Sequence, residues 1–234
     1  RHKRIRGSTV EKPFCEVPPG TRLIETMLWR PDTGVALARR HRDRMGLSAR
    51  RLGFAFDPAS FDAALANVDS DQPLRLRLTL GASGQIEITK APVPPLAGRW
   101  RVAIAPAPLA SANPWLGVKS TRRAFYDDWR AALPEGLDEA LFLNEKGHAC
   151  EGTITNLLVE IDGQWRTPPL ADGVLPGVMR AEILSRGEVQ EASLTLADLH
   201  RATRLRLCNA LRGEIEAVLV AWPDAPTQGD TSND

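Results

Sequence analysis

The stretch Leu74-Arg-Leu-Arg-Leu-Thr-Leu80 alternates apolar and polar residues at every position. This alternation is typical of a β-strand that buries one of its faces. The turn Gly81-Ala-Ser-Gly84 leads from it into a second short stretch, Gln85–Thr89, and the three segments together predict a β-hairpin. Leu74–Leu80 is the clearest strand pattern in the chain, and the segments upstream and downstream of the hairpin have different patterns.

Upstream of the hairpin, the pattern predicts one strand and two helices. Arg22–Trp29 is expected to be the strand, because it is largely apolar and ends at a Pro-Asp-Thr-Gly turn. Over about Ala38–Gly53, apolar residues recur at helical spacing and arginines fill the opposite side. Asp57–Leu65 opens with an N-cap residue followed by proline, which is a typical helix start. Residues 1–20 give little periodic signal and are expected to be irregular.

Downstream of the hairpin, a proline-rich segment separates two parts of the chain. Ala91-Pro-Val-Pro-Pro-Leu-Ala-Gly98 is semi-rigid by composition, and a chain of 234 residues can form two domains of roughly 100 residues each. We therefore predict an N-terminal α+β domain over residues 1–92, a linker over 93–99 and a C-terminal α+β domain over 100–222. The polar residues 223–234 are expected to be a disordered tail.

The second part mixes strand and helix patterns. Strands are expected at 100–105, 140–143, 156–161, 205–207 and 215–220, and helices at 122–133, 177–186 and 196–202. The two kinds of element do not alternate regularly, as a doubly wound parallel sheet would require. The fold class predicted for the whole chain is therefore α+β.

The composition excludes several classes of protein. The formal net charge is +1 with basic residues spread along the chain, which indicates neither nucleic acid nor an anionic membrane as partner. No apolar run approaches the roughly 20 residues of a membrane span. The three cysteines have no metal-ligand spacing and leave one unpaired, which favours a reducing, cytoplasmic location and no metal site.

Lys119 stands out in the segment Pro114-Trp-Leu-Gly-Val-Lys119-Ser-Thr-Arg-Arg123. Only five of the 30 Lys and Arg residues are lysines, so this sequence normally supplies positive charge as arginine. An amine can lose its proton and attack a carbonyl, whereas a guanidinium cannot. Partial burial and the adjacent arginines would lower the pKa of such an amine. By itself, however, the segment is more consistent with an ordinary surface lysine.

Two other positions could bind an anion. In Leu175-Pro-Gly177-Val-Met-Arg180, a Pro-Gly pair precedes an amphipathic helix and leaves the amides of Val178 and Met179 free, which suits a phosphate. Arg44, on the first expected helix, could also reach a phosphate. The ordinary alternatives are a simple turn into a helix and a solvated helix charge.

Glu151 is a candidate partner for a buried cation. It follows Cys150 among small residues, where a carboxylate is poorly solvated, and it could pair with a protonated pyridine nitrogen. An exposed carboxylate at the end of a strand is the alternative. The segment Cys208-Asn-Ala-Leu211 ends another strand, and its loop amides could face an anion. The chain contains no evident arrangement of a nucleophile with its base.

Taken together and in this order, these segments resemble the class IV, or fold type IV, pyridoxal-phosphate enzymes. That family includes branched-chain and D-amino-acid aminotransferases and 4-amino-4-deoxychorismate lyase. The resemblance covers about residues 20–220, and several motifs in register outweigh the ordinary alternatives. They are Ile24-Glu-Thr26, His41-x-x-Arg44-Met, the Arg75–Leu80 strand, Lys119, Glu151-x-x-x-x-Asn156, Leu175-Pro-Gly177-x-x-Arg180 and Cys208-Asn-Ala-Leu211.

The resemblance implies a two-domain fold type IV enzyme with pyridoxal 5'-phosphate as cofactor. Lys119 would form the Schiff base with the cofactor and act as general base, and Glu151 would pair with the pyridine nitrogen. A protonated ring is an electron sink, and an adjacent carboxylate keeps it protonated. The other implied cofactor-binding residues are Arg44, Leu175, Gly177, Val178, Met179, Ala210 and Leu211. A homodimer acting on a small molecule is also implied.

Within the family, Cys208-Asn-Ala-Leu211 resembles the lyase subgroup. Arg123 stands where the lyases usually carry arginine, although Arg122 stands where asparagine is usual. The resemblance favours conversion of 4-amino-4-deoxychorismate to 4-aminobenzoate and pyruvate, a step of folate biosynthesis, with Arg122, Arg123 and Asn209 as candidate substrate-binding residues. An aminotransferase acting on branched-chain or D-amino acids is the first alternative. A catalytically silent, ligand-binding relative is the second.

The sequence departs from the family pattern in two places. Pro18-Pro-Gly20-Thr-Arg replaces a longer pair of N-terminal strands, so we expect a reduced edge in the first domain. Ala124 stands where the aminotransferases carry an aromatic residue, which disfavours a standard branched-chain enzyme.

Overall fold

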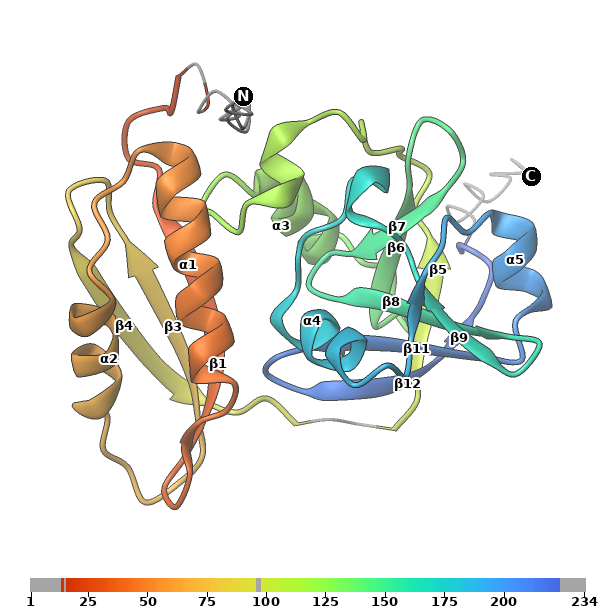
Figure 1. The fold of residues 1–234 in the computed structure, drawn as a ribbon. Coiled ribbons are helices and arrows are strands. Elements are labelled where there is room, and N and C mark those ends of the chain that lie inside the picture. Colours follow the sequence, from red (N-terminus) through yellow and green to blue (C-terminus); the bar gives the residue numbers. More distant parts are fainter. Residues whose placement is uncertain (1–13, 15, 96–97, 224–234) are drawn as a thin grey trace, which may run out of the picture.

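An antiparallel sheet covered by two helices forms the first half of the fold (Figure 1). The structure, a computed structural model, describes residues 14, 16–95 and 98–223. The strand order of this sheet is β2-β1-β3-β4. Its elements are β1 (Leu23–Arg30), β2 (Gly34–Val35), α1 (Ala38–Leu52), α2 (Pro58–Ala66), β3 (Leu74–Leu80) and β4 (Ile86–Pro92).

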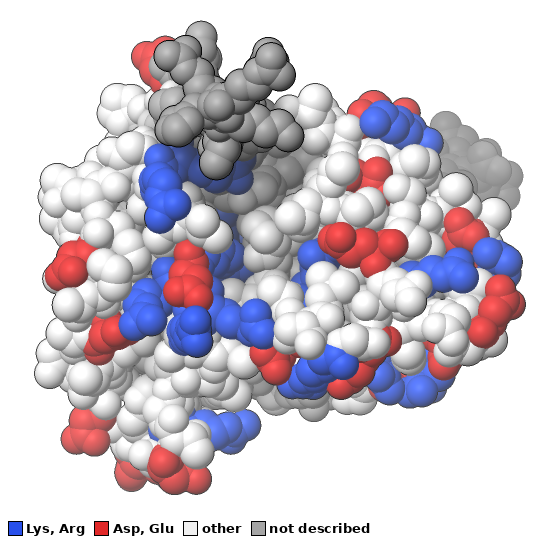
Figure 2. Space-filling view, viewed as in Figure 1, with Lys and Arg blue, Asp and Glu red and all other residues white. Residues whose placement is uncertain are grey.

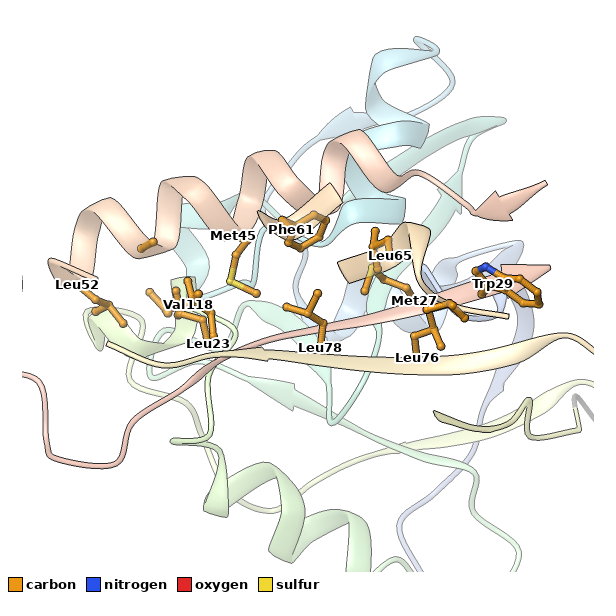
Figure 3. Close-up of a cluster of buried hydrophobic side chains, with 13 residues drawn as sticks. Leu23, Met27, Trp29, Met45, Leu52, Phe61, Leu65, Leu76, Leu78 and Val118 are labelled. Atoms are coloured by element: carbon orange, nitrogen blue, oxygen red, sulfur yellow. The ribbon is translucent and has the colours of Figure 1, made fainter. Parts of the chain in front are cut away.

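The predicted hairpin is confirmed, and its alternation separates two faces. The leucines at even positions of β3 face α1 and α2 and build the first core, together with Met27 of β1, Met45 of α1 and Phe61 of α2 (Figure 3). Asp57 caps α2 by accepting hydrogen bonds from the amides of the first turn, as predicted. The opposite face of β3 carries Arg75 and Arg77, which are exposed toward the second half of the molecule.

The second half is built on an eight-stranded sheet in the order β10-β9-β8-β11-β12-β5-β6-β7. A further pairing of β7 with β8, through Glu151 and Asn156, closes six of these strands into a ring. The strands are β5 (Trp100–Ile104), β6 (Glu139–Leu143), β7 (Ala149–Gly152), β8 (Asn156–Ile161), β9 (Gln164–Thr167), β10 (Gln190–Glu191), β11 (Arg204–Asn209) and β12 (Gly213–Leu219). The helices are η1 (Pro114–Gly117), α3 (Ala124–Ala131), η2 (Leu170–Asp172), α4 (Val178–Ser185) and α5 (Leu196–Arg201).

The mixture of helices and sheets agrees with the predicted fold class, with one addition. Strands β5 and β6 pair in parallel, and α3 lies between them in the chain. Strands β9 and β10 also pair in parallel, and α4 lies between them in the chain. The second half therefore contains two β-α-β crossovers, which the sequence patterns did not reveal. Most other pairs are antiparallel, so the sheet is not doubly wound.

The segment around Lys119 joins the two halves. The amide of Ile24 donates to the Lys119 carbonyl at 2.9 Å, and the amide of Thr121 donates to the Arg22 carbonyl at 2.8 Å. Val118, just before the lysine, is buried in the core of the first half. The lysine segment is therefore fixed to β1 by backbone pairing and by packing.

A charged contact joins the two halves on one outer face. Figure 2 shows basic side chains gathered over α1 beside the hollow between the halves. Arg40 of α1 donates to Glu182 of α4 at 2.7 Å and to the Ser185 hydroxyl at 2.7 Å. Helix α1 is therefore held against α4, near the cavity between the halves.

Some expectations fall on residues outside the described range. Residues 1–13 and 15 of the expected irregular segment, 96–97 of the linker, and 224–234 of the expected tail are among them. Strand β4 runs to Pro92 and so includes the first residues of the proline-rich stretch. Among the described residues, the helices are all too short or too polar to cross a membrane.

Candidate active site

A cavity of about 430 Å³ lies between the two halves, and Lys119 lines it. The lysine side chain is partly buried. Burial first, and then the charges of Arg44 and Arg123, lower the pKa of Lys119 to about 7. A large fraction of this amine is therefore neutral and nucleophilic near neutral pH, as a lysine that bonds to a carbonyl requires.

Glu151 lines the same cavity from the end of β7 and is 5% exposed. Burial raises the pKa of Glu151 to about 7, although hydrogen bonds from Tyr126 and the Leu175 amide oppose this shift. The Tyr126 hydroxyl donates to Oε1 at 2.7 Å, and the Leu175 amide donates to Oε2 at 2.9 Å. The carboxylate is thus fixed in a site where a cationic partner would be strongly favoured.

Arg44 reaches the cavity from α1 and is held by a carboxylate on β1. Its Nε and Nη2 donate to the two oxygens of Glu25 at 2.8 and 2.5 Å, and its Nη1 donates to the Pro176 carbonyl at 3.2 Å. The ring of His41 contacts the same carboxylate at 2.5 Å. Burial alone would raise the pKa of Glu25, but Arg44 and His41 bring it down to about 2.

The start of α4 brings backbone groups to the cavity. Gly177 is its N-cap residue, and a Cβ atom at this position would overlap the amide oxygen of Asn156. Asn156 in turn donates to the Leu175 carbonyl at 3.0 Å. The close approach requires glycine here, and the free amides of the first turn supply positive polarity.

All but one of the residues predicted to bind cofactor or substrate line this cavity. The exception is Met179, which is not among the lining residues and whose side chain packs beside Ile183 and Cys208. In the β11–β12 turn, the amides of Leu211 and Arg212 donate to the Asn209 side chain at 3.1 and 2.8 Å. Asn209 therefore holds the shape of the turn, and its own amide nitrogen donates to the Ile154 carbonyl.

The two arginines after Lys119 differ in how far they are engaged. Arg123 donates to Asp127 at 2.7 Å and to the Thr153 carbonyl at 3.0 Å. Arg122 is exposed, and its guanidinium lies 5.0 Å from the centre of the Trp115 ring. Arg122 is therefore the freer of the two to meet an anion.

Four of these groups match the parts of pyridoxal 5'-phosphate. An amine with a lowered pKa can bond to the cofactor's aldehyde, and a buried carboxylate can pair with its ring nitrogen. A fixed guanidinium beside the start of a helix can bind its phosphate. These are Lys119, Glu151, Arg44 and the first turn of α4. The residues present therefore fit the cofactor that the sequence motifs imply.

Comparison with known proteins agrees with this geometry. The family model described as "Amino-transferase class IV" matches residues 22–219. The chain belongs to the class IV aminotransferase family. Members of this family are pyridoxal-phosphate enzymes, so the predicted family, fold, enzymatic nature and cofactor are confirmed.

Similar class IV proteins carry names of both lyases and aminotransferases. A Schizosaccharomyces pombe protein named "Putative aminodeoxychorismate lyase" is 28% identical over 212 residues, which cover 86% of this chain and 91% of that protein. The structure titled "Putative amino-acid aminotransferase" from Mesorhizobium loti is 40% identical, with a TM-score of 0.81 and coverage of 86% and 100%. The 4-amino-4-deoxychorismate lyase structure from Pseudomonas aeruginosa is 25% identical, with a TM-score of 0.71 and coverage of 88% of each chain.

Two acidic residues that shape this class IV site were missed by sequence reasoning. Glu25 belongs to the Ile24-Glu-Thr26 motif, and a glutamate in an apolar strand at a core-facing position is itself a signal of a buried ion pair. Glu139 is fully buried and accepts hydrogen bonds from the amides of Thr153 and Ile154 and from the Thr155 hydroxyl. It anchors the β7–β8 loop, which lines the cavity.

Tyr126 is a further site residue that the sequence patterns did not indicate. Ala124, where the aminotransferases carry an aromatic residue, opens α3, and Tyr126, two residues later, lines the cavity and donates to Glu151. A phenol hydroxyl is thus present in the site.

Proposed function

We propose that this class IV enzyme is a lyase that converts 4-amino-4-deoxychorismate to 4-aminobenzoate and pyruvate. The observation that carries the proposal is the charge of the cavity. Seven basic residues and two acidic residues line it. The substrate carries two carboxylates, and the cofactor adds a phosphate, so both need a strongly basic site.

The cavity charge is largely available to a ligand. Glu25 pairs with Arg44, and Asp127 pairs with Arg123. Within the described part of the chain, no carboxylate lies within 4 Å of the other four lining arginines, which are Arg75, Arg77, Arg122 and Arg212. A branched-chain amino acid has one carboxylate and an apolar side chain, and it would leave most of these guanidiniums without a partner.

The sequence of the β11–β12 turn also supports the lyase. Cys208-Asn-Ala-Leu211 resembles the lyase subgroup, and relatives named as aminodeoxychorismate lyases match this chain over most of its length or over parts of it. The aminotransferase alternative is supported by the Mesorhizobium loti structure, which is the more similar in sequence. The two reactions share the same cofactor-binding groups, so only the fate of the substrate separates them.

The residues have distinct parts in the proposed reaction. Bound pyridoxal phosphate supplies an electron sink for the substrate carbon that carries the amine. Lys119 Nζ takes the proton from C4 of the substrate's cyclohexadiene ring. The substrate's C3–O bond then breaks, and this ring becomes aromatic. The departing enolpyruvate gains a proton at its methylene carbon and becomes pyruvate. Glu151 holds a proton at the pyridine nitrogen, while Arg44, Gly177 and Val178 bind the phosphate.

The proposal also includes a homodimer in the cytoplasm. The dimer is inferred from the family. The location is inferred from Cys150 and Cys208, which are buried free thiols, as a reducing compartment would leave them. Light scattering of the purified protein tests the first inference, since a monomer at all concentrations would contradict it.

The reaction is tested by incubating the cofactor-loaded protein with 4-amino-4-deoxychorismate and, separately, with single amino acids. The lyase releases 4-aminobenzoate and leaves the cofactor in its aldehyde form. An aminotransferase instead converts the cofactor to its amine form when it meets an amino acid alone. Conversion by leucine or D-alanine without any 4-aminobenzoate would replace the lyase with the aminotransferase. The Lys119→Ala variant is the inactive control.

A further inference from the structure

Arg212 places a partly buried guanidinium at one corner of the cavity. It is the last residue of the β11–β12 turn and lines the cavity, and its amide donates to the Asn209 side chain at 2.8 Å. Its guanidinium lies 5.4 Å from the centre of the Trp100 ring. Its Nε is buried and has no hydrogen-bond partner among the described residues. A buried donor without a partner is costly, which indicates that a ligand completes this site.

The surroundings of Arg212 are cationic. Burial, followed by the charges of Arg130 and Arg75, lowers the pKa of Arg212, and Glu139 only partly opposes this. Arg130 lies 5.8 Å from the centre of the same Trp100 ring and is bound to Glu139 at 3.4 Å. The carboxylate of Glu139 already accepts hydrogen bonds from the β7–β8 loop. An anion from outside the protein is therefore the missing partner of Arg212.

This corner is separate from the group proposed to bind the cofactor phosphate. Arg44 has Glu25 and the Pro176 carbonyl as partners, at the junction of α1 with α4. Arg212, in the β11–β12 turn, lies beside the Trp100 ring, and Arg75 of β3 lines the same cavity. The two arginines share no partner, so an anion held by one leaves the other free.

We propose that Arg212 and Arg75 form a second anion subsite, which binds a carboxylate of the substrate while the cofactor phosphate occupies the Arg44 corner. The inference rests on the proposed function only in that the substrate carries two carboxylates. The subsite makes the enzyme select dianionic over monoanionic substrates. Arg75 comes from the first half of the chain and Arg212 from the second, so the bound carboxylate also bridges the two halves.

The subsite is tested by binding of isophthalate, a rigid aromatic dicarboxylate, to the cofactor-loaded protein. Calorimetric titration should show that Arg212→Gln and Arg75→Gln each weaken isophthalate binding by roughly 10- to 100-fold, the usual effect of losing a charged hydrogen bond. The matched control is Arg204→Gln, which removes an arginine stacked on Trp165 outside the cavity and should leave the affinity unchanged. Unchanged affinity in both cavity variants, or no isophthalate binding to the unaltered protein, would overturn the subsite.

Two further readouts keep this test independent of folding and of the reaction. Arg75 is exposed on β3, so Arg75→Gln decides the outcome if Arg212→Gln does not fold. If the protein releases 4-aminobenzoate but both variants bind isophthalate normally, the lyase stands and the subsite fails. If both variants lose isophthalate binding but no 4-aminobenzoate is released, the subsite stands and the lyase fails.

Discussion

Glu25 on β1 accepts two hydrogen bonds from the Arg44 guanidinium on α1, at 2.8 and 2.5 Å. The alternation of β1 places Glu25 on the same face as Met27 and Trp29, toward α1, while its neighbours Ile24 and Thr26 line the cavity. The strand that borders the cavity therefore also fixes, from behind, the arginine proposed to bind the phosphate.

Glu25→Gln should lower stability, and the loss should depend on pH. Removing one partner of a buried ion pair costs roughly 3–5 kcal/mol. The pKa of Glu25 is about 2 in the folded protein and 4.5 in the unfolded chain, so its contribution is present above pH 4.5 and is lost as the pH falls toward 2. The difference in Tm between the two proteins should therefore be largest near pH 7 and shrink below pH 4.5. A difference that stays constant down to pH 3 would contradict this assignment.

Arg44→Ala should weaken cofactor binding without preventing covalent attachment at Lys119. The variant loses a charged hydrogen bond to the phosphate, and a loss of roughly 10- to 100-fold in affinity is expected. Arg44→Lys should recover only part of it, because an amine cannot make the two-pronged contact with Glu25. Equilibrium dialysis against pyridoxal phosphate measures the affinity. Equal affinity in Arg44→Ala and the unaltered protein would remove Arg44 from the phosphate site.

The lowered pKa of Lys119 predicts how fast the cofactor-free protein reacts with pyridoxal phosphate. Only the neutral amine attacks, and its fraction rises as the pH passes through the pKa of about 7 and is nearly constant above pH 8. Borohydride trapping followed by mass spectrometry should show this profile, with the adduct on Lys119. An ordinary lysine would instead react faster with each pH unit up to about 10. Lys119→Ala should give no adduct while still binding the cofactor weakly.

Tyr126→Phe should change the pH dependence of the reaction. Burial and the nearby Glu151 raise the pKa of Tyr126, so its hydroxyl keeps its proton and donates to the carboxylate. That donation lowers the pKa of Glu151, and its loss should move the acidic limb of the activity profile to higher pH. Glu151→Gln should cut the rate by orders of magnitude at every pH. Full activity of Glu151→Gln would refute its pairing with the ring nitrogen.

Local patterns in the sequence predicted the elements well, because alternation and helical spacing are local properties. The strand over Leu74–Leu80 and the helices beginning at Ala38 and Pro58 lie where the periodicity and the Asp57 cap indicated. The family motifs also indicated Lys119, Glu151 and Arg44 as site residues, and all three line one cavity.

The contacts between distant segments could not be predicted in this way. The pairing of Lys119 with Ile24 and the presence of Arg75 and Arg212 on one cavity involve residues about 95 or more positions apart. Periodicity carries no information about such contacts, since many arrangements of the same elements satisfy it. Arginines occur along the whole sequence, so no local pattern distinguishes Arg212, and the sequence did not predict the cationic corner of the cavity.

The most direct test of the account follows both products of 4-amino-4-deoxychorismate in one reaction. The cofactor-loaded protein should release 4-aminobenzoate and pyruvate in equal amounts over many turnovers, with the cofactor still in its aldehyde form at the end. The Lys119→Ala variant should release neither. If the unaltered protein leaves the substrate intact, or turns over only while the cofactor is converted to its amine form, the lyase assignment is wrong.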